Sequence, residues 1–318
     1  MKLLKLAAAV TVVAMTALPA MAQSWPNGPV QIIVPSRPGG GTDVMARIFA
    51  DYLQSEISSP VVVVNQPAGS GTVAFEQVRT AAPDGQTLLF MHTGMIVNYH
   101  TGQYDHSVAD FTTIGLAQSY PPQVYATGSN APWADLRDFV EDARAHPGER
   151  TIGVSLGGAS HFMAGQMLIS ENIDVKLVDA ATEVDKVAAL QGGFIDLGNM
   201  GASSAEQYVK AGELKVLAMI DPEPYPKYPQ FKTALEEGVD MSWISPLVVW
   251  GPPGMDPAIV EKINASFANM ATDPTTQERL DKADSAFTYY TVEQANKIIS
   301  KEDKKIGSIA VKLGLSVR

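Results

Sequence analysis

The sequence predicts an α/β protein of two lobes, each a mostly parallel sheet flanked by helices, with a ligand cleft between the lobes. Three observations support this prediction. Short apolar segments alternate with segments of helical period, which is typical of a mostly parallel sheet. The alternation restarts partway along the chain, which predicts a second lobe built like the first. The length of 318 residues also exceeds the usual size of one domain.

The first 22 residues have the pattern of a secretory signal peptide. Lys2 and Lys5 precede an apolar stretch at residues 6–18, and Ala20 and Ala22 form a small-x-small cleavage pattern. We expect cleavage after Ala22, which leaves 318 − 22 = 296 residues, and a location in the periplasm. A membrane anchor is the alternative, but the apolar run is shorter than the ~20 residues that a spanning helix needs.

In the first half, each apolar run that predicts a strand is followed by a turn and a helical segment. The first strand, at residues 30–34, ends at a proline and a glycine-rich turn. The helix that follows has one apolar face, formed by Met45, Ile48, Phe49 and Leu53. Further strands are expected at residues 61–64 and 87–91, with a helix at residues 73–82 between them.

The same order of elements restarts near residue 123. Strands are expected at residues 123–127, 151–155, 175–178, 195–199, 215–219 and 247–250, a further element at 185–191, and helices at 133–145, 161–170, 257–270, 274–283 and 292–313. We therefore expect residues 23–122 to form the first part of lobe 1, residues 123–246 to form lobe 2, and residues 247–318 to return to lobe 1 and add the C-terminal helices. The chain would cross between the lobes near residues 119–123 and 245–249.

Composition excludes several classes of function. The chain has no cysteine, which excludes thiol catalysis and cysteine-ligated metals. Its formal charge of −11 becomes −11 − 2 = −13 without Lys2 and Lys5, so nucleic acid is a poor partner. No His-Glu-x-x-His motif or other metal-ligand spacing occurs, and we expect neither a metal nor a cofactor.

Two glycine-containing loops follow the first two predicted strands. Gly39, Gly40, Gly41, Thr42 and Asp43 lie between a strand and a helix. Glycines let backbone N–H groups approach an anion at a helix N-terminus, whereas Thr42 or Asp43 could instead only cap the helix. The spacing matches neither a dinucleotide fingerprint nor a nucleotide P-loop. The second loop spans residues 65–72, and two neighbouring loops of this kind could present N–H donors to one carboxylate.

Residues 153–157 match the Gly-x-Ser-x-Gly nucleophile elbow of serine hydrolases. A hydrolase of that fold needs an acid and then a histidine downstream of Ser155. The only histidine after Ser155 is His161, which is too close in the chain to be the remote histidine of a triad. We therefore interpret this loop as a ligand-binding or capping loop, and keep a secreted hydrolase that uses Ser155 as the alternative.

From Trp25 to the C-terminal helices, the chain resembles the periplasmic binding components of tripartite tricarboxylate transporters, the Bug-type family. The order and spacing of many short segments together make the resemblance specific. These segments are Val34-Pro35 with residues 39–43 and Arg47, then residues 62–67, 83–85 and 87–89, Tyr104-Asp105, Asp110-Phe111, Pro147-Gly148, and residues 190–193, 211–215 and 233–238.

The resemblance implies a type II-like periplasmic binding protein that closes on a small organic acid, with di- or tricarboxylates favoured. It implies a monomer that delivers this ligand to the membrane permease subunits of a transporter. In that family the first two glycine-containing loops hold one ligand carboxylate, largely through backbone groups and ordered water. The candidate ligand-binding residues are accordingly Ser36, Arg37, Gly39, Gly40, Gly41, Thr42, Asp43, Asn65, Ala68, Gly69, Ser70, Gly71, Thr72 and Thr93 in lobe 1, and Ser155, Gly157, Gly158, Ser160, His161, Asp196 and Ser203 in lobe 2.

The chain departs from the family pattern where the cleft is expected. Ser36, which is followed by Arg37, stands where the family usually has an aromatic residue, and the second loop and residues 178–182 are also altered. An inward-pointing Arg37 would favour a ligand with more than one carboxylate, and a solvent-facing Arg37 is the alternative. A solute-sensing adaptor for a membrane receptor would share the fold and the site.

Overall fold

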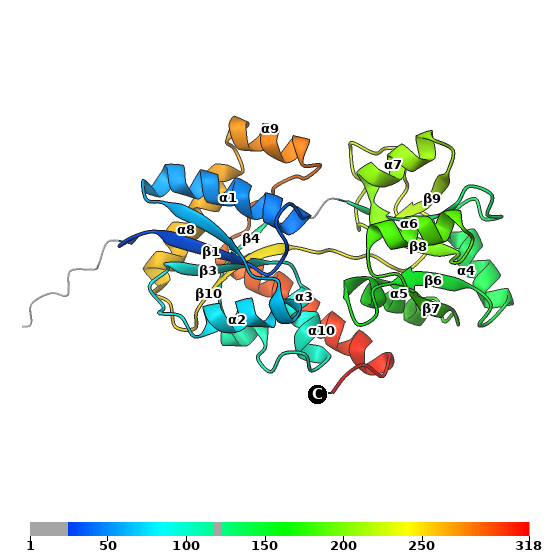
Figure 1. Ribbon diagram of the computed structural model, residues 1–318, viewed down its shortest axis with the longest axis horizontal. Helices are drawn as coiled ribbons and strands as arrows, with labels where there is room; N and C mark the ends of the chain where they lie inside the picture. Colours follow the sequence, from blue (N-terminus) through cyan, green and yellow to red (C-terminus); the bar gives the residue numbers. More distant parts are fainter. Residues whose placement is uncertain (1–24, 118–121, 318) are drawn as a thin grey trace, which may run out of the picture.

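The computed structural model describes residues 25–117 and 122–317, which form two lobes side by side (Figure 1). The predicted signal peptide and residues 119–121 of the first predicted crossing lie outside the described residues. Within the described part of the chain, no helix has both the length and the apolar character that a membrane span requires. The predicted lobe boundaries at residues 122 and 246 stay a prediction.

The first lobe contains a five-stranded sheet in the order β2-β1-β3-β10-β4. Its parallel strands are β1 (Val30–Val34), β2 (Val61–Asn65) and β3 (Thr87–Met91). Strand β10 (Leu247–Gly251) is antiparallel to both β3 and β4 (Thr112–Ala117), so β4 runs in the same direction as β3. One reversed strand in an otherwise parallel sheet confirms the predicted sheet class.

Helices cover both faces of this first sheet. They are α1 (Gly41–Ile57), α2 (Thr72–Arg79), α3 (Gly94–His100) and α8 (Pro257–Met270), and α9 (Pro274–Lys282) packs on α1. The predicted apolar face of α1 is confirmed, because Met45, Phe49 and Leu53 are all buried. The Phe49 ring stacks on Phe267 of α8 with centroids 4.6 Å apart, which joins the N-terminal and C-terminal parts of the lobe.

The second lobe repeats this arrangement with a sheet in the order β7-β6-β8-β5-β9. Its strands are β5 (Gln123–Gly128), β6 (Thr151–Val154), β7 (Lys176–Asp179), β8 (Leu197–Gly201) and β9 (Leu214–Met219), with β5 antiparallel to both neighbours. Its helices are α4 (Leu136–Ala145), α5 (Ala159–Ser170), α6 (Glu183–Gln191) and α7 (Ala202–Lys210). Helix α4 begins three residues later than predicted, because the carboxylate of Asp135 caps it by accepting the N–H of Asp138 at 2.9 Å.

The C-terminal helix α10 (Val292–Lys312) contacts both lobes. It packs on β4 and α3 of the first lobe and on α5 of the second lobe. A Cβ atom at Gly165 of α5 would lie 2.5 Å from Leu313 Cδ1, so the glycine permits this close approach. The last helices were predicted to pack on lobe 1, but α10 packs on α5 of lobe 2 as well.

A second contact between the lobes involves Asp284, which follows α9. Its carboxylate accepts hydrogen bonds of 2.5 Å from both Lys227 Nζ and Tyr228 Oη. The Tyr228 ring stacks on Phe231 and belongs to the apolar core of the second lobe. The C-terminal part of lobe 1 is therefore linked to lobe 2 by a hydrogen-bonded carboxylate as well as by helix packing.

Candidate functional site

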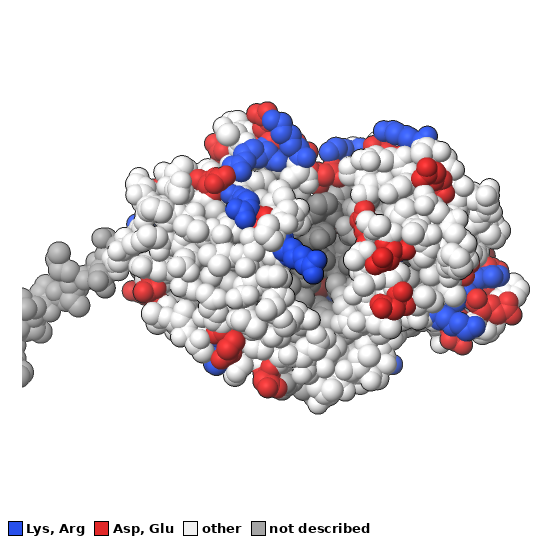
Figure 2. Space-filling view, in the orientation of Figure 1, with Lys and Arg blue, Asp and Glu red and all other residues white. Residues whose placement is uncertain are grey.

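Each sheet has a topological switch point, where successive strand connections leave to opposite sides. The loops at this point face the other lobe. In lobe 1 the chain leaves β1 to one side for β2 and then crosses to β3 on the other side. In lobe 2 it leaves β6 for β7 and then crosses to β8. Ligands of open α/β sheets bind at such points, outside the carboxyl ends of the strands. Figure 2 shows a hollow between the two lobes, and Gln103 Nε2 of lobe 1 lies 3.9 Å from the Cβ position of Gly157 in lobe 2.

Asp43 ties the two glycine-containing loops of lobe 1 together. Its buried carboxylate accepts the N–H of Gly39 at 2.8 Å, Nε of Arg47 at 3.0 Å and Nδ2 of Asn65 at 2.8 Å. Arg47 also donates to Asn65 Oδ1 at 3.1 Å. Burial alone would raise the pKa of Asp43, but the hydrogen bonds from Arg47, Gly39 and Asn65 lower it below its usual value. The structure thus gives Asp43, Asn65 and the Gly39 N–H positioning roles, where the sequence analysis listed them as ligand contacts.

Other backbone donors of these loops have no acceptor. The N–H groups of Gly41 and Thr42, in the first turn of α1, bond to no described residue. Gly40 precedes them as the N-cap and offers no side chain. In the second loop Gly69, Ser70 and Gly71 all have positive φ, and the Ser70 carbonyl accepts Nδ2 of Asn98 at 2.9 Å. The α1 N-terminus therefore has N–H groups and a dipole that suit a carboxylate.

Two buried hydroxyl groups stand beside this switch point without a partner. Ser36 follows β1 and Thr93 follows β3, and these two strands are neighbours. Neither Ser36 Oγ nor Thr93 Oγ1 has a hydrogen-bond partner among the described residues, although both atoms are buried. Buried hydroxyls are normally hydrogen-bonded, so both are candidates to bind a ligand or an ordered water.

His92 is a residue that the sequence analysis did not select. It lies between β3 and Thr93, and its Nδ1 accepts the N–H of Gly94 at 3.0 Å. Burial lowers the pKa of His92 to about 4, so the ring is neutral at pH 7. A histidine directly after a parallel strand, next to a selected threonine, was the signal that could have identified it.

In lobe 2 the predicted loop after β6 is held by its own side chains. The N–H of Ser155 donates to Ser160 Oγ at 2.8 Å, and the N–H of Gly157 donates to His161 Nδ1 at 3.0 Å. Gly158 is the N-cap of α5. Burial lowers the pKa of His161, so a neutral ring that accepts at Nδ1 carries its proton on Nε2. That Nε2–H group has no acceptor among the described residues and is free to donate to a ligand.

This geometry differs from that of a serine hydrolase. In a catalytic triad the histidine accepts the serine proton at one nitrogen and donates from the other to a carboxylate. Here His161 Nδ1 is occupied by a backbone donor, and Nε2 carries a hydrogen. Among the described residues no carboxylate contacts the His161 ring. The Gly-x-Ser-x-Gly match therefore lacks the partners that would make Ser155 a nucleophile.

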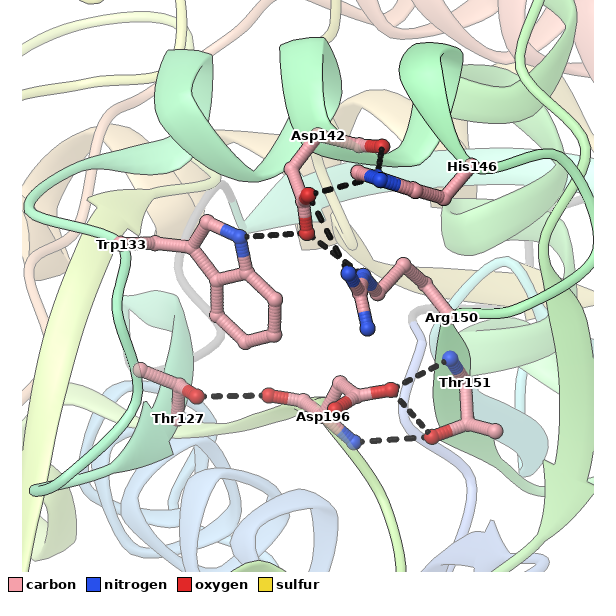
Figure 3. A network of polar contacts seen from close by, with 7 residues as sticks. All are labelled: Thr127, Trp133, Asp142, His146, Arg150, Thr151 and Asp196. Carbon is pink, nitrogen blue, oxygen red and sulfur yellow. Dashed lines mark hydrogen bonds and ion pairs between the residues drawn. The ribbon is translucent and has the colours of Figure 1, made fainter.

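Asp196 lies away from the cleft, contrary to its selection from the sequence. It precedes β8, at the opposite end of the sheet from Ser155, and its Oδ2 accepts both the N–H and the hydroxyl of Thr151 at 2.8 Å (Figure 3). Figure 3 also shows Arg150 on the carboxylate of Asp142, beside Trp133. Asp196 was predicted from its region of the chain, and the sequence pattern did not show at which end of β8 it lies.

The remaining selected residues differ in exposure. Arg37 and Ala68 are exposed, and Arg37 has no ion-pair partner among the described residues. Ser203 is half-buried in the first turn of α7, where it interacts with Tyr228. Thr72 donates to the carbonyl of Gly69 at 2.8 Å, which stabilises the turn before α2.

A polar cluster at the carboxyl ends of β8 and β9 was not predicted from the sequence. Lys186 of α6 donates to Asn199 Oδ1 at 2.7 Å, and Asn199 Nδ2 donates to Gln123 Oε1 at 3.2 Å. The N–H of Gln123 in turn donates to Asp221 Oδ2 at 3.1 Å. Burial raises the pKa of Asp221 to about 6. Only the fold brings these residues together, because they come from four separate segments of the chain.

Comparison with known proteins agrees with this architecture. The chain is 26% identical over 316 residues to the "UPF0065 protein in gbd 5'region" of Cupriavidus necator, covering 98% of this chain and 96% of that protein. A TctC solute-binding protein from Polaromonas superposes with a TM-score of 0.78 at 23% identity, covering 91% of this chain and all of that one. The Rhodopseudomonas palustris protein Rpa4515, solved with adipate, gives 0.76 at 22% identity, with 92% and 99% covered.

These likenesses confirm the two-lobed fold of a periplasmic binding protein. The family model described as "Tripartite tricarboxylate transporter family receptor" matches residues 45–315, which is most of the chain. The resemblance noted from the sequence is thereby confirmed, and the chain belongs to the tripartite tricarboxylate transporter receptor family.

Proposed function

We propose that the protein is a periplasmic solute-binding protein that captures a small organic acid and delivers it to the permease subunits of a tripartite transporter. The observation that supports this most strongly is the set of unpaired donors at the two facing switch points. They are the N–H groups of Gly41 and Thr42, the hydroxyls of Ser36 and Thr93, and Nε2–H of His161. Donors directed at a cleft, without catalytic partners, suit reversible binding of an anion.

The proposed binding mode divides the ligand between the lobes. One carboxylate lies at the N-terminus of α1, where the free N–H groups and the helix dipole stabilise negative charge. The other end of the ligand meets the loop after β6 and the N-terminus of α5 in lobe 2. Because the two ends lie on different lobes, binding favours a closed arrangement of the lobes.

The protein acts in this proposal as an exported monomer that does no chemistry on its ligand. Export follows from the predicted signal peptide, and the transporter partner follows from the family. A hydrolytic role for Ser155 is disfavoured because His161 offers no free acceptor nitrogen to the serine.

A thermal-shift screen of the mature chain against mono-, di- and tricarboxylates tests the proposal. Adipate belongs in the panel because a protein of the same fold was solved with it. At a hundredfold excess over Kd, a ligand adds about 2.7 kcal/mol to the free energy of unfolding, which gives a clear rise in Tm. Mass spectrometry of the released ligand should recover it unaltered. A panel without any stabilising acid, or an acid recovered in altered form, would rule the proposal out.

A further inference from the structure

Lys186 is a buried cation at the edge of the lobe-2 sheet that faces the cleft. Its helix, α6, begins after the carboxyl end of β7, and Glu183 in the first turn accepts the N–H of Gly201, the last residue of β8, at 3.0 Å. The first turn of α6 therefore lies over the carboxyl end of β8. Lys186 follows one turn later, with 5% of its surface exposed.

The two sheet strands beneath Lys186 leave room for its aliphatic stem. Gly153 of β6 and Gly198 of β8 are register partners. A Cβ atom at Gly153 would lie 3.6 Å from Lys186 Cγ, and one at Gly198 would lie 3.4 Å from Lys186 Cβ. The stem thus packs over the two strands at positions where neither has a side chain. The ammonium group reaches Asn199, one residue closer to the carboxyl end of β8.

The ammonium group has fewer partners than its charge requires. Its one hydrogen bond to a described residue is to Asn199 Oδ1 at 2.7 Å, although an ammonium group has three donors. None of the described carboxylates lies within 4.0 Å of it to form an ion pair. Burial lowers the pKa of Lys186 to about 8, while Glu183 and Asp185 act in the opposite direction, so the group is mostly charged at pH 7. A buried charge without a counter-ion is unfavourable until an anion joins it.

We infer that Lys186 binds the second carboxylate of a dicarboxylate ligand, at the lobe-2 switch point between β6 and β8. This inference rests on the proposed function, in which the first carboxylate lies on the loops of lobe 1. The ligand carboxylate supplies the missing counter-ion, and a monocarboxylate leaves the ammonium group unpaired. Lys186 then determines specificity for dicarboxylates, with Asn199 holding its end group in place. Arg37 is exposed, so water screens any pair that it forms.

Calorimetric titration at pH 7 tests this inference with pairs of acids of equal carbon number: succinate and butyrate, glutarate and pentanoate, adipate and hexanoate. In Lys186→Met the affinity for the dicarboxylate that binds wild type most tightly should fall about 10- to 100-fold, the scale of a hydrogen bond to a charged group. The affinity for the matched monocarboxylate should change by less than about threefold, because that ligand has no group for Lys186. Lys297→Met, on the exposed surface of α10, is the control for an exposed cation and should leave the ratio of the two affinities nearly unchanged.

Asn199→Asp is a second variant, in which Lys186 keeps a partner. It allows the inference to be tested even if Lys186→Met does not fold. The aspartate carboxylate at position 199 forms an ion pair with the Lys186 ammonium group and takes the place of the ligand carboxylate. The affinity for the dicarboxylate should therefore fall, while the affinity for the monocarboxylate is retained. Equal losses for both acids of a pair, no loss for the dicarboxylate, or a wild type that prefers monocarboxylates would each overturn the role of Lys186. A wild type that binds no acid in the panel would instead count against the proposed function.

Discussion

Replacing Asp43 with alanine is expected to lower the free energy of unfolding by about 3 kcal/mol and to weaken ligand binding at least tenfold. The substitution removes the acceptor shared by Gly39, Arg47 and Asn65. The two loops that present the proposed donors would then lose their link. Urea unfolding followed by circular dichroism measures the first effect, and calorimetry with the best ligand measures the second.

The exposed pair between Asp51 and Arg279, 2.7 Å apart, supplies the matched control. Asp51→Ala should cost less than about 1 kcal/mol and leave binding intact, because exposed ion pairs contribute little. Similar losses for both variants would contradict the linking role of Asp43.

The pH dependence of the free energy of unfolding follows from the lowered pKa of Asp43. A carboxyl whose folded pKa is depressed stabilises the fold above its unfolded value, which is near 3.8, and loses this contribution as the pH falls through the folded pKa.

The second large effect is expected for Gly71→Ala, which should cost about 3 kcal/mol and abolish tight ligand binding. Gly71 has a φ of 91°, a conformation that costs an alanine about 1–2 kcal/mol. Its added Cβ would also lie 2.9 Å from Pro35 Cβ and 3.0 Å from Phe75 Cζ. Relief of these contacts would push the second loop away from the end of β1, where the first loop begins.

Gly212→Ala separates the two contributions to this effect. Gly212 has a φ of 73°, but an added Cβ there would meet nothing within 4 Å. This control should therefore lose only the backbone contribution of about 1–2 kcal/mol and bind ligand normally. Chemical unfolding and calorimetry of both variants measure the difference. If Gly71→Ala bound ligand as wild type does, the position of the second loop would not matter for binding.

Local sequence patterns predicted most elements of the fold because their signals lie within a few residues. The apolar face of α1 and the strand at residues 30–34 are examples. Helices α3 and α7 and strand β4 were missed. Helix α3 has seven residues and no clear period, and among the described residues β4 pairs only with β10, which is distant in the sequence. Pairing between distant segments leaves no local trace.

The candidate site was predictable only in part, for the same physical reason. The glycine-containing loops carry their signal in consecutive residues, so residues 36–43 and 65–72 could be selected. The positioning role of Asp43 depends on Asn65, which only the pairing of β1 with β2 brings near. Lys186 was not selected from the sequence, because the glycines that accommodate its stem lie in two other elements. Asp196 was selected by its region of the chain, but it precedes β8 and lies at the opposite end of the sheet from Ser155.

Small-angle scattering of the mature chain, with and without the acid that gives the largest thermal shift, tests most directly whether the two lobes close on a ligand in the cleft. Ligand ends held by different lobes should draw the lobes together, so the radius of gyration should decrease at saturation. Calorimetry on the same sample establishes that the site is full. A saturated protein whose radius of gyration and distance distribution match those of the free protein would contradict closure of the cleft on its ligand.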